Sequence, residues 1–237
     1  MEIIKNIIEK LKNTEYNFDK ESEYLDEIVN LPVELEKEII DYVSFLSENI
    51  DEDNEYYFVF LLDALHRRGS KKAIFDLGSK AILSDEFEDK EFYATLLIKN
   101  DFLGTEKILI KSLEIIESFD EFGGYAQEKI LEYLIEKEVE EAYPQVIKCL
   151  SDVAARVRAT ALHFIRKFDK QESSLYLVEM LEAEDWEYNI LFILDLLKKW
   201  KKADFLPQII EYSKEEWVKE NIEINDAFKN LINHLST

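Results

Sequence analysis

Three histidines and one cysteine are the side chains of this sequence best suited to metal binding or nucleophilic chemistry. His66, His163 and His234 lie far apart along the chain, and none has a second His or a Cys at the spacing that a zinc site requires. Cys149 falls within a helical apolar pattern, which indicates a small buried hydrophobic residue. We therefore predict no metal site and no cofactor.

Carboxylates are abundant, but their spacing does not indicate a reaction. The acidic run at 51–55 alternates like a calcium loop, yet Tyr56 occupies the position that needs glycine and Leu62 the one that needs glutamate. Asp and Glu pairs recur throughout the chain, so no pair is distinguished as general acid and base. Gly123-Gly124 predicts a link between two helices rather than a phosphate-binding loop. We expect no catalytic residues and no enzymatic activity.

The charge of the chain narrows the classes of partner. With a formal net charge of −23, the protein has a field that repels phosphate groups, and this argues against nucleic acid as a partner. No apolar stretch approaches the ~20 residues that a membrane-spanning helix needs. The lone cysteine is typical of a reducing compartment. We predict a cytoplasmic protein that does not bind a membrane.

The spacing of apolar residues predicts an all-α protein. They recur at steps of three and four along almost the whole chain, and only five Gly and three Pro are available for turns. Gly69 follows one such helical segment, where a left-handed residue commonly ends a helix. Ser70 is then expected to cap the next helix with its side chain.

A repeat of 31 to 37 residues organises these helices. The pair Ile74 and Leu77 recurs as Ile110 and Leu113 after 36 residues, and two further copies follow at intervals of 37 and 31. Periods of this length indicate stacked two-helix units, because one such unit cannot bury its apolar face alone. We predict about six antiparallel helix pairs. After a pair at 39–68, the expected pairs are 71–83 with 89–99, 105–118 with 125–137, 141–150 with 154–168, 173–182 with 186–200, and 204–213 with 216–235.

One unit carries a recognisable signature. Residues 146–165 contain a turn with Asp152, then Val157-Arg158, then Ala161 and an apolar residue four positions later, and this pattern resembles a HEAT-like repeat. The resemblance implies a right-handed α-solenoid in which Val157 and Ala161 pack at the helix crossing. It also implies that Arg158 reaches the turn aspartate of its own or a neighbouring repeat, and we expect a link to Asp152. The other units lack the Val-Arg pair.

The N-terminal residues do not follow the repeat. We interpret residues 1–32 as an irregular helical cap, because the first unit of a solenoid has one face towards water. Residues 33–237 are then expected to form a single continuous domain of HEAT-like repeats.

Candidate partner-binding residues lie on the second helix of each pair, which lines the concave side in HEAT-like solenoids. Aromatic and arginine side chains are the usual anchors of protein interfaces, because they bury a large area at low entropic cost. The candidates of these types are Tyr93, Tyr125, Tyr133, His163, Arg166, Trp186, Tyr188 and Trp200.

These features favour a non-enzymatic protein-protein interaction module, an acidic solenoid that binds a basic protein partner. One specific form is a bacterial immunity or inhibitor protein that masks a cationic toxin. A separate class is a purely structural scaffold or adaptor, in which several weak contacts are spread along the solenoid. Because some HEAT-like proteins are enzymes, such as alkylpurine DNA glycosylases and relatives of bilin lyases, an enzyme is the alternative class. The negative charge disfavours the glycosylase, which must hold a DNA backbone.

Overall fold

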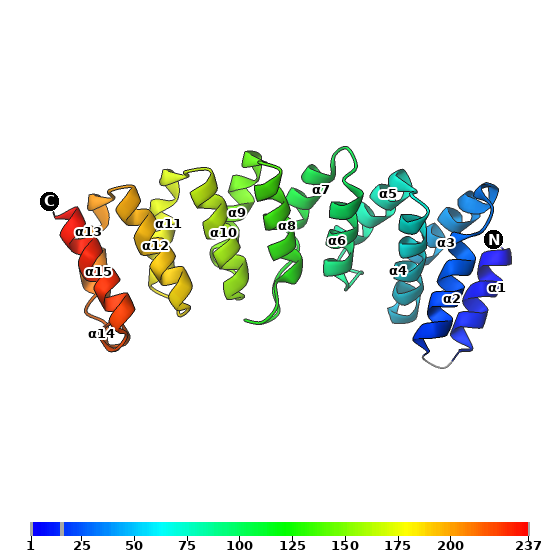
Figure 1. Ribbon diagram of the computed structural model, residues 1–237, viewed down its shortest axis with the longest axis horizontal. Coiled ribbons are helices and arrows are strands. Elements are labelled where there is room, and N and C mark those ends of the chain that lie inside the picture. The colour runs from blue at the N-terminus through cyan, green and yellow to red at the C-terminus, as the bar shows by residue number, and fades with distance from the viewer. Residues whose placement is uncertain (1, 15–16, 237) are drawn as a thin grey trace. The chain divides into compact units, whose positions relative to one another are not determined.

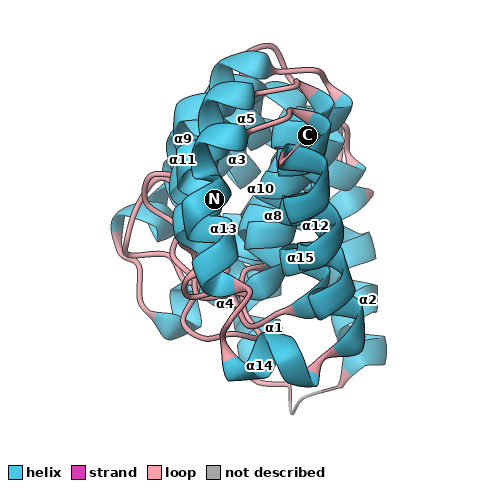
Figure 2. Ribbon diagram, turned by 90° about the vertical axis from the view of Figure 1, so that its left-hand side faces the viewer, coloured by secondary structure: helices cyan, strands magenta, loops and turns pink. Residues whose placement is uncertain are grey.

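The computed structural model describes residues 2–14 and 17–236, and these form helices and connecting segments without a strand (Figure 2). The predicted all-α class is confirmed. The chain packs as two compact units, Met1–Ile116 and Glu117–Thr237. The boundary between these units lies at 116/117. The predicted division into a cap of residues 1–32 and a domain of residues 33–237 stays a prediction. Residues 1, 15 and 16 of the predicted cap, and residue 237, lie outside the described residues.

The first unit contains seven α-helices within its described residues (Figure 1). They are α1 (Glu2–Lys12), α2 (Phe18–Val29), α3 (Glu36–Glu48), α4 (Glu52–Arg67), α5 (Lys71–Ile82), α6 (Lys90–Asn100) and α7 (Thr105–Ser112), with a 3-10 turn at Val33–Leu35 before α3. Helix α4 contacts α3 and α5, its neighbours in sequence, and also α2 and α6. Contact with both the next helix and the one after it is what stacked helix pairs produce.

Arg68 ties the N-terminal helices to the rest of the first unit. Its guanidinium lies at the C-terminal end of α2, where Nη1 donates to the main-chain oxygens of Val29 and Leu31, both at 2.8 Å, and to that of Ile28 at 3.2 Å. Carbonyl groups at the C-terminal end of a helix lack donors from a following turn, and a cation also complements the negative end of the helix dipole. The predicted cap region is therefore anchored by a residue from the end of α4.

The second unit contains eight α-helices within its described residues (Figure 1). They are α8 (Tyr125–Glu136), α9 (Tyr143–Cys149), α10 (Ala155–Lys167), α11 (Ser174–Leu181), α12 (Glu187–Lys199), α13 (Leu206–Tyr212), α14 (Glu216–Glu220) and α15 (Ile222–Leu235), with 3-10 turns at Glu140–Ala142, Gln171–Ser173 and Ala203–Phe205. Helix α10 contacts α8 and α12, and α12 contacts α15, so these four helices form a row. Helices α9, α11 and α13 pack behind it, against α10, α12 and α15.

The C-terminal ends of four helices share one backbone arrangement. Gly69, Glu138, Asp169 and Lys201 all have positive φ and follow the last turn of α4, α8, α10 and α12. After each of them, the next amide donates to a carbonyl five residues back, as Lys170 does to Ile165 at 3.0 Å. This is the Schellman arrangement, which satisfies the otherwise unpaired carbonyls of the last turn. The left-handed conformation predicted at Gly69 is confirmed, and the same geometry recurs at positions that are not glycine.

Lys201→Gly is therefore expected to stabilise the second unit by about 0.5–1 kcal/mol. Lys201 has φ +52°, a conformation that is costly for a residue with a Cβ and free of strain for glycine. The measurement is the free energy of unfolding from urea titration followed by circular dichroism. Lys202→Gly serves as the matched control, because Lys202 has φ −78° and gains nothing from glycine. Equal effects from the two substitutions would contradict this explanation.

Local hydrogen bonds place some helix ends differently from the prediction. The helix expected at 105–118 ends at Ser112, and the segment expected as one helix at 216–235 is divided at Asn221. The Asn221 side chain accepts from the amides of Glu223 and Ile224, both at 3.1 Å, and so caps α15. Ser70 precedes α5 as expected, but its side chain makes no capping hydrogen bond, so that prediction is wrong in its mechanism.

Candidate protein-binding surface

Three of the eight predicted partner-binding residues are interior side chains. Tyr93, Tyr133 and Trp200 are buried, with exposed fractions of 0%, 5% and 8%. The expectation that these rings lie on an exposed face is corrected. Aromatic residues fill the space between packed helices at low entropic cost, and their polar atoms find partners there.

Two of these buried rings have well-defined polar partners. The Tyr93 hydroxyl donates to Glu55 at 2.9 Å, and burial together with that carboxylate raises the pKa of Tyr93. The Trp200 indole N–H donates to Asp169 at 2.8 Å. This hydrogen bond, with further ones from Gln171 and Lys199, lowers the pKa of Asp169 to about 2. Tyr93 thus connects α6 to the first turn of α4, and Trp200 connects the end of α12 to the turn after α10.

The other five predicted residues lie close together in the second unit. They come from α8, α10 and the start of α12, which lie side by side (Figure 1). We call this set, with one additional arginine and one additional phenylalanine, the aromatic strip; its residues are Tyr125, Arg156, His163, Arg166, Trp186, Tyr188 and Phe192.

Ring contacts connect the strip along α10 and α12. The rings of Trp186 and Tyr188 lie 5.5 Å apart between centroids, and those of Tyr188 and Phe192 lie 5.8 Å apart. The His163 ring meets the edge of Phe192 at 4.9 Å. Trp186 and Tyr188 remain exposed, by 42% and 45%, so the strip offers apolar area to solvent.

His163 is held in one orientation by two neighbours. Its Nε2 lies 2.8 Å from the Tyr188 hydroxyl and its Nδ1 lies 3.4 Å from Arg166 Nη2. Because a guanidinium can only donate, Nδ1 is the acceptor, and Nε2 carries the proton and donates to Tyr188. Partial burial and the Arg166 charge lower the pKa of His163, so the ring is uncharged at neutral pH.

Both arginines of the strip lie on aromatic rings. The Arg156 guanidinium is 4.1 Å from the Tyr125 ring centroid and also pairs with Glu128 at 3.4 Å. Arg166 lies 4.3 Å from the Phe192 ring centroid. Cation-π contact fixes flat, extended side chains on the surface, which reduces the entropy lost when a partner binds.

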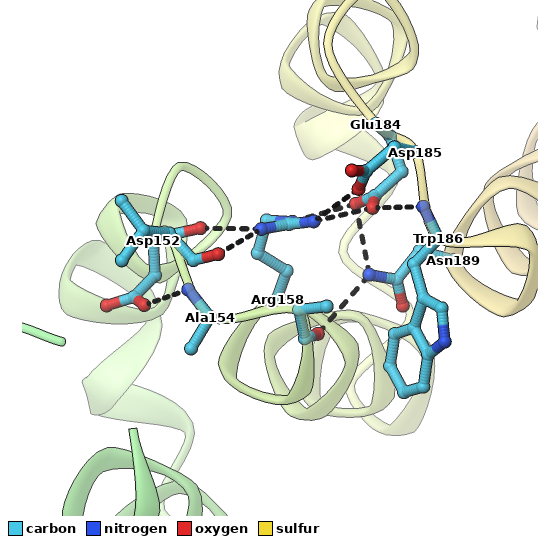
Figure 3. A network of polar contacts seen from close by, with 9 residues as sticks. Asp152, Ala154, Arg158, Glu184, Asp185, Trp186 and Asn189 are labelled. Carbon is cyan, nitrogen blue, oxygen red and sulfur yellow. Dashed lines mark hydrogen bonds and ion pairs between the residues drawn. The ribbon is translucent and has the colours of Figure 1, made fainter. Parts of the chain in front are cut away.

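Behind the strip, Arg158 forms a largely buried polar network (Figure 3). Its Nη1 donates to the main-chain oxygens of Asp152 and Val153, both at 2.9 Å. Its Nε and Nη2 bind the two carboxylate oxygens of Glu184 at 2.8 and 2.6 Å. The expected link to Asp152 therefore exists through the main chain. The Asp152 carboxylate instead accepts from the amide of Ala154 at 2.8 Å.

The other two signature residues are structural, as the resemblance implies. Val157 and Ala161 are both fully buried on α10. Val157 approaches the backbone of Gly124 at the start of α8, where a Cβ on Gly124 would lie 2.4 Å from Val157 Cγ2. Small and β-branched side chains at these positions allow α10 to pack closely against its neighbours.

Glu184 is the carboxylate partner of Arg158, and the sequence did not predict it. Its side chain is fully buried, and it accepts from Asn189 Nδ2 and from the main-chain amide of Trp186, both at 3.0 Å. The resemblance implies that the arginine can reach an acid in the turn of a neighbouring repeat. Glu184 lies in the turn before α12, and this position is the signal that could have identified it. The network thereby fixes the turn that carries Trp186 into the aromatic strip.

Two pockets adjoin this network in the second unit. The larger, of about 530 Å³, lies between α9 and α11, where Ile147, Leu150 and Met180 provide apolar lining. Arg158 and Glu184 also line it, but they already satisfy each other. The smaller, of about 310 Å³, lies beside the exposed strip and includes Trp186 and Arg156 in its walls.

The residues considered for metal binding and nucleophilic chemistry stay apart. Within residues 2–14 and 17–236, no cluster of His, Cys, Asp or Glu has the geometry of a metal site. Burial raises the pKa of the Cys149 thiol to about 12, so this side chain is a buried thiol at neutral pH, as predicted. None of the described helices has the length and apolar character needed to cross a bilayer.

Comparison of the chain with protein-family models, with curated proteins and with solved structures finds no significant match.

Proposed function

We propose that this protein is a non-enzymatic protein-binding module that captures a basic protein partner on the aromatic strip of its second unit. In this proposal the helices form a right-handed HEAT-like solenoid of antiparallel pairs. The contacts of α4 with α5 and α6, and of α11 with α12 and α13, support that arrangement. A buried single cysteine is consistent with action in a reducing compartment such as the cytoplasm.

The aromatic strip is the observation that carries the proposal. Side chains from α8, α10 and α12 converge there, and Tyr125, Trp186 and Tyr188 keep between 42% and 47% of their area exposed. Aromatic residues and arginine are the commonest hot spots of protein interfaces. Their rings are held by contacts with one another and by the Arg158 network, so little ordering is needed on binding.

The charge of the chain supports a basic partner. The net charge of −23 attracts cationic proteins and speeds their association, and Glu121 and Asp185 line the pocket beside Trp186 of the strip. Within the strip, Arg156 is paired with Glu128 and His163 is uncharged at neutral pH. Arg166 contacts the Phe192 ring and the His163 imidazole.

Selection of peptides from a random display library on the immobilised full-length protein tests the proposal. We expect the selected sequences to carry net positive charge with aromatic or aliphatic residues, and their affinity to fall as salt rises. Acidic or neutral selected sequences, with affinity indifferent to salt, would contradict capture of a basic partner.

Trp186→Ala is expected to weaken binding of a selected peptide by about 30-fold, equivalent to about 2 kcal/mol, because it removes an aromatic anchor from the centre of the strip. Fluorescence anisotropy of a labelled peptide measures the dissociation constant. Trp217→Ala is the matched control, since Trp217 is exposed by 38% on α14, outside the strip. If both substitutions weakened binding equally, the strip would not be the binding surface.

A further inference from the structure

The smaller pocket beside the aromatic strip combines rings with carboxylates. Its volume is about 310 Å³, and it is lined by Glu121, Phe122, Ala155, Arg156, Asp185 and Trp186. Three separate segments contribute these residues: the loop before α8, the first turn of α10 and the turn before α12. All of them belong to the second unit.

The two rings of this pocket are accessible to a ligand. Phe122 is 72% exposed, and Trp186 is 42% exposed. An aromatic face attracts a cation through its quadrupole, and its carbon surface also packs against the methylene stem of a long side chain. Exposed phenylalanine and tryptophan rings that line one pocket are typical of an interaction site.

The two carboxylates of the pocket make few contacts with the rest of the protein. Glu121 makes no hydrogen bond or ion pair within the described part of the chain. The Asp185 side chain is 88% exposed, and it forms an ion pair with Arg158 at 3.5 Å. Arg158 already binds Glu184 through two shorter contacts, so Asp185 adds a second carboxylate to a neutralised cation. Figure 3 shows Glu184, Asp185 and Trp186 in one turn, with Arg158 beside it.

Arg156 is the cation in the pocket lining, and its charge is engaged elsewhere. Its guanidinium lies over the Tyr125 ring and pairs with Glu128 on α8. Asp185 and Glu121 therefore leave the pocket with an excess of negative charge. A volume of about 310 Å³ is at the small end of ligand sites, and it suits one long side chain rather than a helix or strand.

We propose that this pocket receives one lysine or arginine side chain of the basic partner. The cationic group lies at Asp185 and Glu121, and the methylene stem packs against Phe122 and Trp186. The inference rests on the proposed function and specifies the chemistry that the partner must present. The aromatic strip provides the apolar contact, and this pocket provides the recognition of charge.

Nuclear magnetic resonance of the full-length, nitrogen-15-labelled protein tests the pocket. The probes are N-acetyl-arginine methylamide and its uncharged isostere N-acetyl-citrulline methylamide, titrated at constant ionic strength. We expect the arginine probe to shift the Trp186 indole signal saturably, with a dissociation constant in the millimolar range. The citrulline probe is expected to bind about tenfold more weakly, because it lacks the charge. Equal shifts from the two probes would overturn the proposal.

Substitutions assign the effect to the two carboxylates. Asp185→Asn and Glu121→Gln are each expected to weaken binding of the arginine probe about threefold, as for exposed ion pairs, and about tenfold together. Asp226→Asn is the matched control, because Asp226 is an exposed acid on α15, away from the pocket, and pairs with Lys229 at 3.2 Å. An unchanged dissociation constant in the double variant would also overturn the proposal.

The same variants separate this inference from the proposed function. If selected basic peptides require Trp186 but bind the double variant with unchanged affinity, the pocket assignment fails and the binding module stands. If basic peptides do not bind the strip, the proposed function fails, whatever the arginine probe does.

Discussion

Arg158→Ala is expected to lower the free energy of unfolding of the second unit by about 3–5 kcal/mol. The substitution removes two charge-assisted hydrogen bonds from Glu184, whose side chain is fully buried, and so leaves a carboxylate without its counter-ion. It also leaves the main-chain oxygens of Asp152 and Val153 without their donor. Native-state hydrogen exchange of amides in α10 and α12 measures the effect for this unit.

Two further variants test that the buried charge is the cause. Arg156→Ala, on the same helix, is expected to cost about 1 kcal/mol or less, because the Arg156 and Glu128 side chains remain about one third exposed. Adding Glu184→Gln to Arg158→Ala is expected to recover part of the lost stability, since an uncharged amide is less costly to bury. A double variant less stable than Arg158→Ala would contradict this explanation.

Gly124→Ala is expected to destabilise the second unit by about 2–5 kcal/mol, combining backbone strain with overpacking. Gly124 has φ +82° at the start of α8, a conformation that disfavours a Cβ. The added atom would lie 2.4 Å from Val157 Cγ2 and 3.0 Å from Ala154 Cβ, so α8 and α10 would have to move apart. The same hydrogen-exchange measurement reports the loss.

Two other glycines separate the strain from the collision. Gly69→Ala, with φ +77° and no atom within 4 Å of the new Cβ, is expected to cost only the conformational part, about 1–2 kcal/mol. Gly123→Ala, where the nearest atom would be at 3.4 Å, is expected to have the smallest effect of the three. A loss at Gly124 no larger than that at Gly69 would show that α8 and α10 adjust without cost.

Most helices could be predicted because their causes are local. The steps of three and four between apolar residues follow from the helical period, and the repeated leucines Leu77, Leu113, Leu150 and Leu181 are all buried as that pattern requires. A left-handed helix end was predictable only at Gly69, since glycine is the residue that most often adopts this conformation. Glu138, Asp169 and Lys201 adopt it although their residue types give no such signal.

The candidate surface was only partly predictable, because the exposure of its side chains depends on contacts between helices. Residue type identified Tyr125, Trp186 and Tyr188 as anchors, but the same criterion selected Tyr93 and Trp200, which are buried. On these helices an aromatic ring serves equally well between helices or on their surface. Which one occurs depends on the direction in which each helix faces its neighbours, and single-helix periodicity does not encode that direction.

By itself, the sequence determined the all-α class, the repeated helices and the negative charge of the chain, because these depend on composition and on contacts within a few residues. Only the tertiary structure decided that Arg158 pairs with Glu184, that Gly124 must remain free of a Cβ, and that Tyr125, His163 and Tyr188 lie in one strip. Each of these depends on packing between residues of different helices and turns, and the spacing of residues in one chain does not specify how its helices approach one another.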